Sequence, residues 1–250
     1  MPPMYDWLTL LAIAGTFLLA GSVKGVIGLG LPTVSLGLLT AALDLTTAMA
    51  LLIVPSFVTN LWQGAVGGHA RAIIVRTWPF LLTAAAFVWV GAQGLTAVST
   101  HLLSALLGVL LILYATLNLA GVRIQVTAMH ERWVGPVFGT INGILTGLTG
   151  SFVVPGVMFL QAIGLSRDML VQAMGILFAV STVALAGALH SHDLLTLTQS
   201  GISLAAVVPA IVGMLIGQWI RKRLSEATFR KVFFVAILLL GLYIVAQALG

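Results

Sequence analysis

The sequence contains no cysteine, so disulfide bonds, thiolate metal sites and thiol nucleophiles are excluded. It also contains little charge, because Lys, Arg, Asp and Glu make up 7% of the chain against about 25% in ordinary soluble domains. Eleven basic and six acidic residues cannot cover the surface of a soluble protein of 250 residues. Apolar residues make up 60% of the chain and the mean hydropathy is +1.15, which identifies an integral membrane protein.

Charged and turn-forming residues divide the apolar sequence into ten segments. A helix needs about 20 residues to cross a bilayer, and six of the ten segments reach or approach that length. The pairs 7–23/30–43 and 133–148/152–164 fall short, and a glycine-rich stretch that ends in proline joins each pair. We therefore expect an all-α polytopic membrane protein with about eight full spans and short hairpin segments. The segments are 7–23, 30–43, 46–66, 74–97, 101–120, 133–148, 152–164, 169–189, 197–220 and 229–249.

The basic residues all fall on one side of the membrane if successive segments change sides. They are Lys24, Arg71, Arg76, Arg123, Arg132, Arg167, Arg221, Lys222, Arg223, Arg230 and Lys231. The opposite side carries Asp6, Asp44 and Asp193. The positive-inside rule assigns the basic side to the cytoplasm and both termini to the outside. The net charge of +5 then reflects topology, so nucleic acid is not an expected partner. Because the N-terminus has no basic n-region, we treat it as the mature start.

The two halves of the chain resemble each other. The matching positions are Gly21, Gly25 and Gly28 with Gly143, Gly147 and Gly150, Pro32 with Pro155, Asp44 with Asp168, Pro79 with Pro209, and Tyr114 with Tyr243. Each half, 1–122 and 123–250, holds five segments, so the second half enters the membrane upside down relative to the first. Such an inverted repeat is a common plan of secondary transporters, which bind substrate near the membrane midplane where the repeats meet.

The two glycine-rich stretches, 21–32 and 139–155, predict a break in the helices at membrane depth. Irregular backbone is tolerated there only where protein buries it or where it lines a wet cavity. A half-helix that begins near Pro32 or Pro155 would point free N–H groups and a positive dipole end at the break, which suits a small anion. The alternative is that glycines four residues apart let neighbouring helices pack closely.

Lys24 lies within the first stretch, with apolar sequence on both sides. A lysine at the bilayer centre costs about 2.5–3.5 kcal/mol, which a bound anion would offset. Alternatively, the segment 7–23 spans fully and the lysine extends to the cytoplasmic headgroups.

The other candidate residues are polar side chains and glycines around the two stretches. The predicted substrate site comprises Lys24, Gly25, Gly28, Gly30, Asn142, Thr146, Thr149, Gly150 and Ser151. Asp44 and Asp168 each begin a helix, where an N-cap is the simpler role and proton coupling the alternative. Further amides serve in helix packing or line a cavity: Asn60, Gln63, Asn118, Gln161, Gln172 and Gln218.

Neither an enzyme nor a metal protein is expected from these residues. No Gly-x-Ser-x-Gly context surrounds Ser151, and no HExxH or P-loop pattern occurs in the chain. His190, His192 and Asp193 are weak evidence for a metal site, and we expect no cofactor.

The segment Lys24-Gly-Val-Ile-Gly-Leu-Gly-Leu-Pro32, the stretch 139–155 and Gln172-Ala-Met-Gly175 resemble the TauE/SafE family of sulfite and organosulfonate exporters. The resemblance covers essentially the whole chain. Many members carry three consecutive glycines in these motifs, where this chain has Gly28-Leu-Gly30 and Gly150-Ser151. The resemblance implies proton-coupled export of sulfite, sulfoacetate or related sulfonates across a bacterial inner membrane, with both termini periplasmic.

Alternatives of other classes remain open on the sequence. They are a passive anion channel of the same architecture, an importer of a small anion, and a membrane scaffold whose glycine faces bind partner helices. The expected partners are a small anion and membrane lipid, and a homodimer is compatible with the sequence.

Overall fold

The computed structural model describes residues 5–122, 125–223 and 225–250 and shows only helices and loops in them. Arg123, one of the predicted cytoplasmic charges, and the first four residues of the expected mature start lie outside this part of the chain. The helices are α1 (Trp7–Ile27), α2 (Leu31–Ala42), α3 (Leu45–Ala65), α4 (Ala70–Ala92), α5 (Gly94–Ala97), α6 (Thr100–Leu119), α7 (Glu131–Thr149), α8 (Gly156–Ala162), α9 (Arg167–Ser191), α10 (Leu197–Ala205), α11 (Val207–Arg221) and α12 (Glu226–Leu249).

Seven helical stretches of the described chain are long and apolar enough to cross a membrane, one fewer than the eight expected. They include α4 with α5, and α10 with α11, each pair counted as one stretch. The helix α7 is 19 residues long but is not among the seven. The protein is a multi-pass membrane protein of helices, as the composition predicts.

The prediction that 7–23 and 133–148 are short was wrong. The helix α1 continues through Lys24 to Ile27 and is 21 residues long, because the chain first leaves the helix at Gly28. The short elements are the second members of the two pairs. The helix α2 has 12 residues, and only seven residues of the predicted segment 152–164 form α8.

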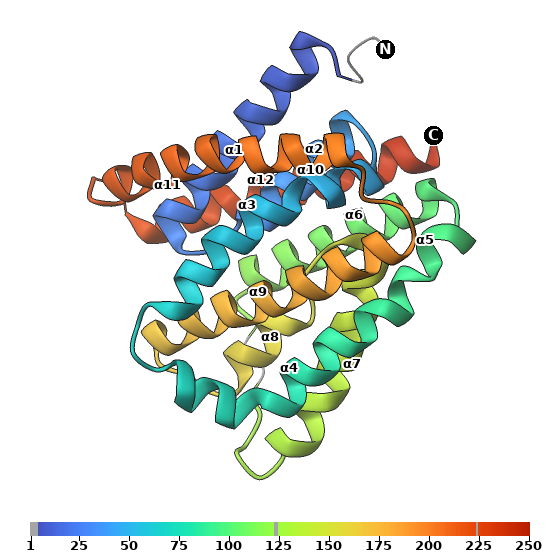
Figure 1. The fold of residues 1–250 in the computed structure, drawn as a ribbon. Helices are drawn as coiled ribbons and strands as arrows, with labels where there is room; N and C mark the ends of the chain where they lie inside the picture. The colour runs from blue at the N-terminus through green and yellow to red at the C-terminus, as the bar shows by residue number, and fades with distance from the viewer. Residues whose placement is uncertain (1–4, 123–124, 224) are drawn as a thin grey trace.

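The helices α3 and α9 form the centre of the bundle and run antiparallel to each other (Figure 1). In both, 61% of the apolar window is buried, against 28% in the stretches that contain α11 and α12. Two contacts fix their register: the hydroxyl oxygens of Ser56 and Thr182 are 3.3 Å apart, and the amide of Gln63 donates to the carbonyl of Val171 at 2.7 Å.

The outer helices pair across the two halves of the chain: α1 packs on α11, α7 on α4, and α6 on α12. A Cβ atom at Gly21 would collide with the backbone carbonyl of Ala210, and one at Gly217 with that of Ser22. The α4–α7 pair has the same close approach, since a Cβ at Gly147 would collide with the carbonyl of Val88. Close helix packing, the alternative interpretation, therefore accounts for Gly21 and Gly25 and for their matches at Gly143 and Gly147.

The remaining matches between the halves differ in quality. Gly28 and Gly150 both end a helix with a left-handed backbone, at φ values of 79° and 73°. The matched residues Tyr114 and Tyr243 differ in their surroundings, since Tyr114 is 1% exposed and Tyr243 is 56% exposed. The two tyrosines thus face opposite ways, one toward the core and one toward the membrane.

Candidate functional site

The first break separates α1 from α2. Gly28 ends α1, and its N–H donates to the carbonyl of Lys24 at 2.8 Å. Gly30 precedes α2 with φ 109°, a backbone conformation that side-chain-bearing residues rarely adopt, and Pro32 lies in the first turn of α2. The predicted break is therefore confirmed at Gly28-Leu-Gly30. Gly25 is not part of it, because it lies inside α1, where its N–H is used in the helix.

The second break, between α7 and α8, is longer and extended. Gly150 ends α7, and residues 151–155 have no helical structure although four of these five are buried. Thr146 fixes the start of the break by donating from its hydroxyl to the carbonyl of Ser151 at 3.0 Å. Asn142 fixes its end, because its side-chain oxygen accepts from the N–H of Gly156 at 2.9 Å. Thr149 accepts from the N–H of Ser151 at 3.3 Å, so the predicted polar residues hold this break in shape.

Three consecutive peptide N–H groups in the second break have no hydrogen-bond partner in the described part of the chain. They belong to Phe152, Val153 and Val154, which are all buried. Buried peptide N–H groups are nearly always paired, and at membrane depth an unpaired one costs several kcal/mol. The break thus presents free donors inside the protein.

Lys24 is buried in the bundle, with 3% of its surface exposed. Its ammonium group donates to the side-chain oxygen of Asn60 and to the hydroxyl of Thr59, the latter at 3.2 Å. Within the described residues the structure records no ion pair for Lys24. The lysine therefore does not extend to the headgroups, and its charge is buried among neutral groups.

A chain of hydrogen bonds leads from Lys24 to the centre of the bundle. The amide nitrogen of Asn60 donates to the hydroxyl of Ser56 at 2.9 Å, and Ser56 contacts Thr182 of α9. Ser181, next to Thr182, has a buried hydroxyl without a partner. The sequence indicated Asn60 only as one of several amides, and it gave no signal for Ser56, Thr59 and Thr182 beyond small polar residues at helical spacing.

Lys24 and Asn142 lie at about the same depth. The register of α3 with α9 places Asn60 beside residues 175–178. A Cβ atom at Gly156, whose N–H Asn142 holds, would be 2.9 Å from the side chain of Leu177. Asn142 is fully buried, and its amide nitrogen has no hydrogen-bond partner among the described residues. Each half of the chain therefore brings one polar side chain with an N–H donor to this depth, about one helical turn from the Ser56–Thr182 contact.

The two glycine turns do not meet at the midplane, contrary to prediction. Beside Gly28 lies Val171, 3.6 Å from the position of a Cβ atom, and Val171 in turn pairs with Gln63 near the end of α3. Beside Gly150 lies Met49, at 2.7 Å, near the start of α3. Met49 and Gln63 are fourteen residues apart, about 21 Å along a helix. Gly28 and Gly30 thus lie toward one end of the bundle and Gly150 toward the other.

Asp44 and Asp168 differ in what they contact. Asp44 is the N-cap of α3 and accepts from the N–H of Thr47 at 2.9 Å and from the hydroxyl of Thr46 at 2.6 Å. Burial alone raises the pKa of Asp44, but these hydrogen bonds outweigh it and lower the pKa below its ordinary value. The carboxylate thus stays ionised, which favours the capping role. Asp168 is exposed in the first turn of α9, where Ser166 is the N-cap.

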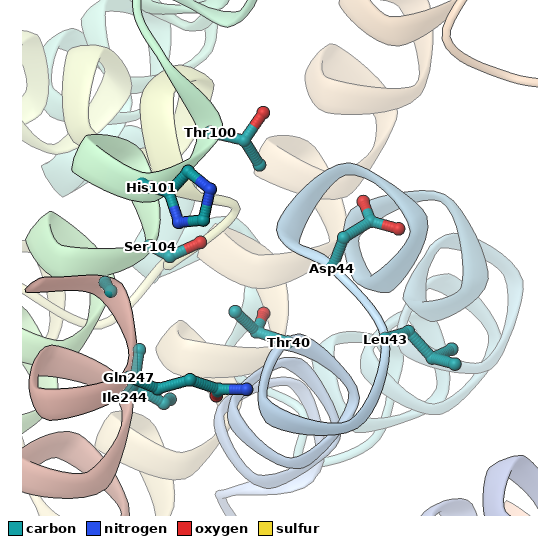
Figure 2. Close-up of a pocket in the computed structure, with 9 residues that line it drawn as sticks. Thr40, Leu43, Asp44, Thr100, His101, Ser104, Ile244 and Gln247 are labelled. Carbon is teal, nitrogen blue, oxygen red and sulfur yellow. The ribbon is translucent and has the colours of Figure 1, made fainter. Parts of the chain in front are cut away.

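Asp44 also borders a cavity of about 320 Å³ at one end of the bundle. Figure 2 shows Thr40, His101 and Gln247 around the same space. The hydroxyl of Thr40 is buried and has no hydrogen-bond partner in the part of the chain that the structure describes. The cavity thus contains a carboxylate, an imidazole and a free hydroxyl, and none of the predicted glycines.

The sequence was compared with known proteins. The family model described as sulfite exporter TauE/SafE matches residues 13–244, nearly the whole chain. Searches of curated proteins and of solved structures gave no match. The family is one of membrane transporters of sulfur-containing anions, which agrees with the buried cation and the apolar helices. The chain belongs to the sulfite exporter TauE/SafE family.

Proposed function

We propose that the protein is a secondary transporter that exports small sulfur-containing anions, such as sulfite, sulfoacetate or related sulfonates, across a bacterial inner membrane. The observation that carries this proposal is Lys24, a buried ammonium group with only neutral partners. A buried charge is costly until it is paired, and the missing partner is an anion.

The groups at the depth of Lys24 suit an oxyanion. Sulfite and sulfonates carry three oxygen atoms that accept hydrogen bonds, with two negative charges on sulfite and one on a sulfonate. Lys24 supplies the positive charge, and the free amide nitrogen of Asn142 supplies a donor from the other half of the chain. The unpaired N–H groups of residues 152–154 supply further donors along the second break. One cation with neutral donors binds an anion less tightly than several cations would, so the anion can also be released.

The packing of the helices supports an inverted repeat that moves by alternating access. In such a repeat α1 corresponds to α7 and α11 to α4, so the pairs α1–α11 and α7–α4 are equivalent. The pairs α3–α9 and α6–α12 would lie on the symmetry axis. Rocking of one group of helices against the other would expose the middle depth to each side in turn.

The test is uptake of radiolabelled sulfite and ethanesulfonate into proteoliposomes with wild type, Lys24→Ala and Lys222→Ala. Lys222 is exposed and serves as the control for the loss of one cation. We expect saturable flux that an imposed pH gradient changes and that only Lys24→Ala abolishes. Equal flux in wild type and Lys24→Ala would contradict the role of Lys24. Flux that neither saturates nor responds to the gradient would indicate a passive channel.

A further inference from the structure

A second cavity, of about 710 Å³, is lined by neither Lys24 nor Asn142. It is formed by the C-terminal ends of α6 and α8, the first part of α12, and the loop that follows α6. The loop is fixed to α8 because the N–H of Val126 donates to the carbonyl of Ala162 at 2.9 Å. The volume is in the range of small-molecule sites, about 300–1,000 Å³.

Among the described residues that line this cavity, Arg230 is the only charged one, and none carries a carboxylate. Its guanidinium carbon lies 5.9 Å from the ring of Phe234, which is held in place by an edge-on contact with Tyr114 at 5.3 Å between ring centres. Within the described residues the structure records no ion pair for Arg230. The planar, permanently charged guanidinium group binds an oxyanion through two parallel hydrogen bonds.

Neutral side chains complete the lining. Within the described chain the structure records no hydrogen bond for the side-chain amides of Gln125 and Gln161, so these groups are available to a ligand. The side-chain nitrogen of Asn118 donates to the carbonyl of Tyr114 at 2.8 Å, which leaves its side-chain oxygen available to other donors. The cavity thus offers one cation and two free amides.

The negative end of α8 also points toward this region, but Arg76 offsets it. Arg76 donates to the carbonyl of Ile163, just after α8, at 2.6 Å and pairs with Glu131 at 2.6 Å. A cation at the C-terminal end of a helix is favourable because it opposes the helix dipole. Arg230 therefore supplies the charge of the described part of the lining.

The cavity at the other end of the α6–α12 pair has a different charge pattern. There the first residues of α6, including His101, face the last residues of α12 across from the carboxylate of Asp44. An anion entering that cavity meets a carboxylate, whereas the described lining of the Arg230 cavity presents none. The two ends of the protein thus differ in their affinity for negative charge.

We propose that the Arg230 cavity is a peripheral binding site for a small oxyanion, which collects the anion on the basic side before it reaches Lys24. The identity of the ligand as a sulfur oxyanion rests on the proposed function. The phosphate of a lipid headgroup has the same chemistry, so the experiment separates the two sources.

The test measures equilibrium binding of radiolabelled sulfite and ethanesulfonate to the full-length protein in a phosphate-free maltoside detergent. The Lys24→Ala background removes the central cation, and Arg230→Ala and Lys231→Ala are compared in that background. Lys231 is the next residue, is exposed and does not line the cavity. We expect binding in Lys24→Ala that Arg230→Ala weakens about tenfold and Lys231→Ala leaves within twofold, as loss of a charged hydrogen-bond partner predicts.

Binding that is unaffected by Arg230→Ala, or reduced equally by Lys231→Ala, would overturn the proposal. Binding that disappears when phosphatidylglycerol is added would assign the cavity to lipid phosphate and overturn it as a site for the free anion. In proteoliposomes we expect Arg230→Ala to raise KM about tenfold with little change in maximal flux. If wild type transports neither anion but retains the Arg230-dependent binding, the proposed function fails while the site stands.

Discussion

The two breaks of the bundle are built on the same plan but contribute different chemistry. Each begins one turn after a buried polar residue, Lys24 in α1 and Thr146 in α7, and each turns on a left-handed glycine. Lys24 reaches across to α3, whereas Thr146 bonds to the carbonyl of Ser151 in its own break. The first half thus supplies charge, and the second supplies an extended backbone with free N–H groups.

In the proposed inverted repeat, this difference would make the site asymmetric. An anion held between two identical cations would be bound strongly from both halves and released slowly. One cation opposed by neutral donors keeps the positive charge needed for selection while limiting the affinity. Four predictions compare residues of the two halves directly, and they are ordered from the largest expected effect to the smallest.

Of the two polar residues that precede the breaks, Lys24 and Thr146, replacing the charged Lys24 should have the largest effect. We expect Lys24→Met to lower transport about 100-fold, the loss of one charged hydrogen bond, while the free energy of unfolding stays equal or rises because a buried charge is replaced by an apolar chain. The matched variant Thr146→Val should keep transport within a few fold. Flux assays measure transport, and SDS unfolding of the purified proteins measures the free energy of unfolding. Normal flux in Lys24→Met would contradict the role of the Lys24 charge in transport.

The two left-handed glycines should differ in their tolerance of a methyl group. Gly150→Ala would bring a Cβ atom within 2.7 Å of Met49, whereas the same atom at Gly28 would be 3.6 Å from Val171. Both variants bear the cost of a left-handed alanine, about 1–2 kcal/mol, and Gly150→Ala adds an overpacking cost of about 1–3 kcal/mol. Unfolding titrations should rank Gly28→Ala as the milder variant. The reverse order would contradict the packing described for the second break.

Asn142 should matter for stability because it holds the end of the extended break. Its counterpart in the first half, at the offset of the matching glycines, is Ala20, where no extended segment needs a partner. Asn142→Ala leaves the buried N–H of Gly156 unpaired and should cost about 1–3 kcal/mol. Asn118→Ala is the control, since Asn118 bonds only to its own helix. Equal unfolding free energies for the two variants would argue against the role of Asn142.

The smallest effects concern the two aspartates. Asp44→Ala removes an N-cap and should cost about 1 kcal/mol at pH 7, whereas Asp168→Ala should cost less because Ser166 caps α9. The pKa of Asp44 is lowered in the folded protein, so its stabilisation is complete above its unfolded pKa of about 3.9 and is lost as the pH falls through the folded pKa. Melting temperatures at pH 7 and at lower pH should show the wild-type advantage shrinking on acidification. A wild-type advantage over Asp44→Ala that instead grows on acidification would show that the folded protein favours protonated Asp44.

Much of the architecture was predictable from the sequence. Mean hydropathy, charge placement and the glycine-proline stretches predicted the membrane helices, both breaks and the family. The depth of each residue was not predictable, because it depends on the register of α3 with α9, which side-chain contacts such as Ser56 with Thr182 set. The partners of Lys24 were also out of reach, since Thr59 and Asn60 are 35 and 36 residues away in the chain.

The close glycine contact between α1 and α11 has a consequence for biosynthesis. The end of α1 at Ile27 precedes the start of α11 at Val207 by 180 residues. At a synthesis rate of about 5–20 residues per second, α1 waits roughly 10–40 s in the membrane before its partner is made. During that interval the groove at Gly21 and Gly25 has no helix packed against it. Once α11 is in place, a Cβ atom at either glycine would collide with the backbone of that helix. The newly made first half is therefore a target for any membrane chaperone or quality-control protease that recognises unpaired glycine faces.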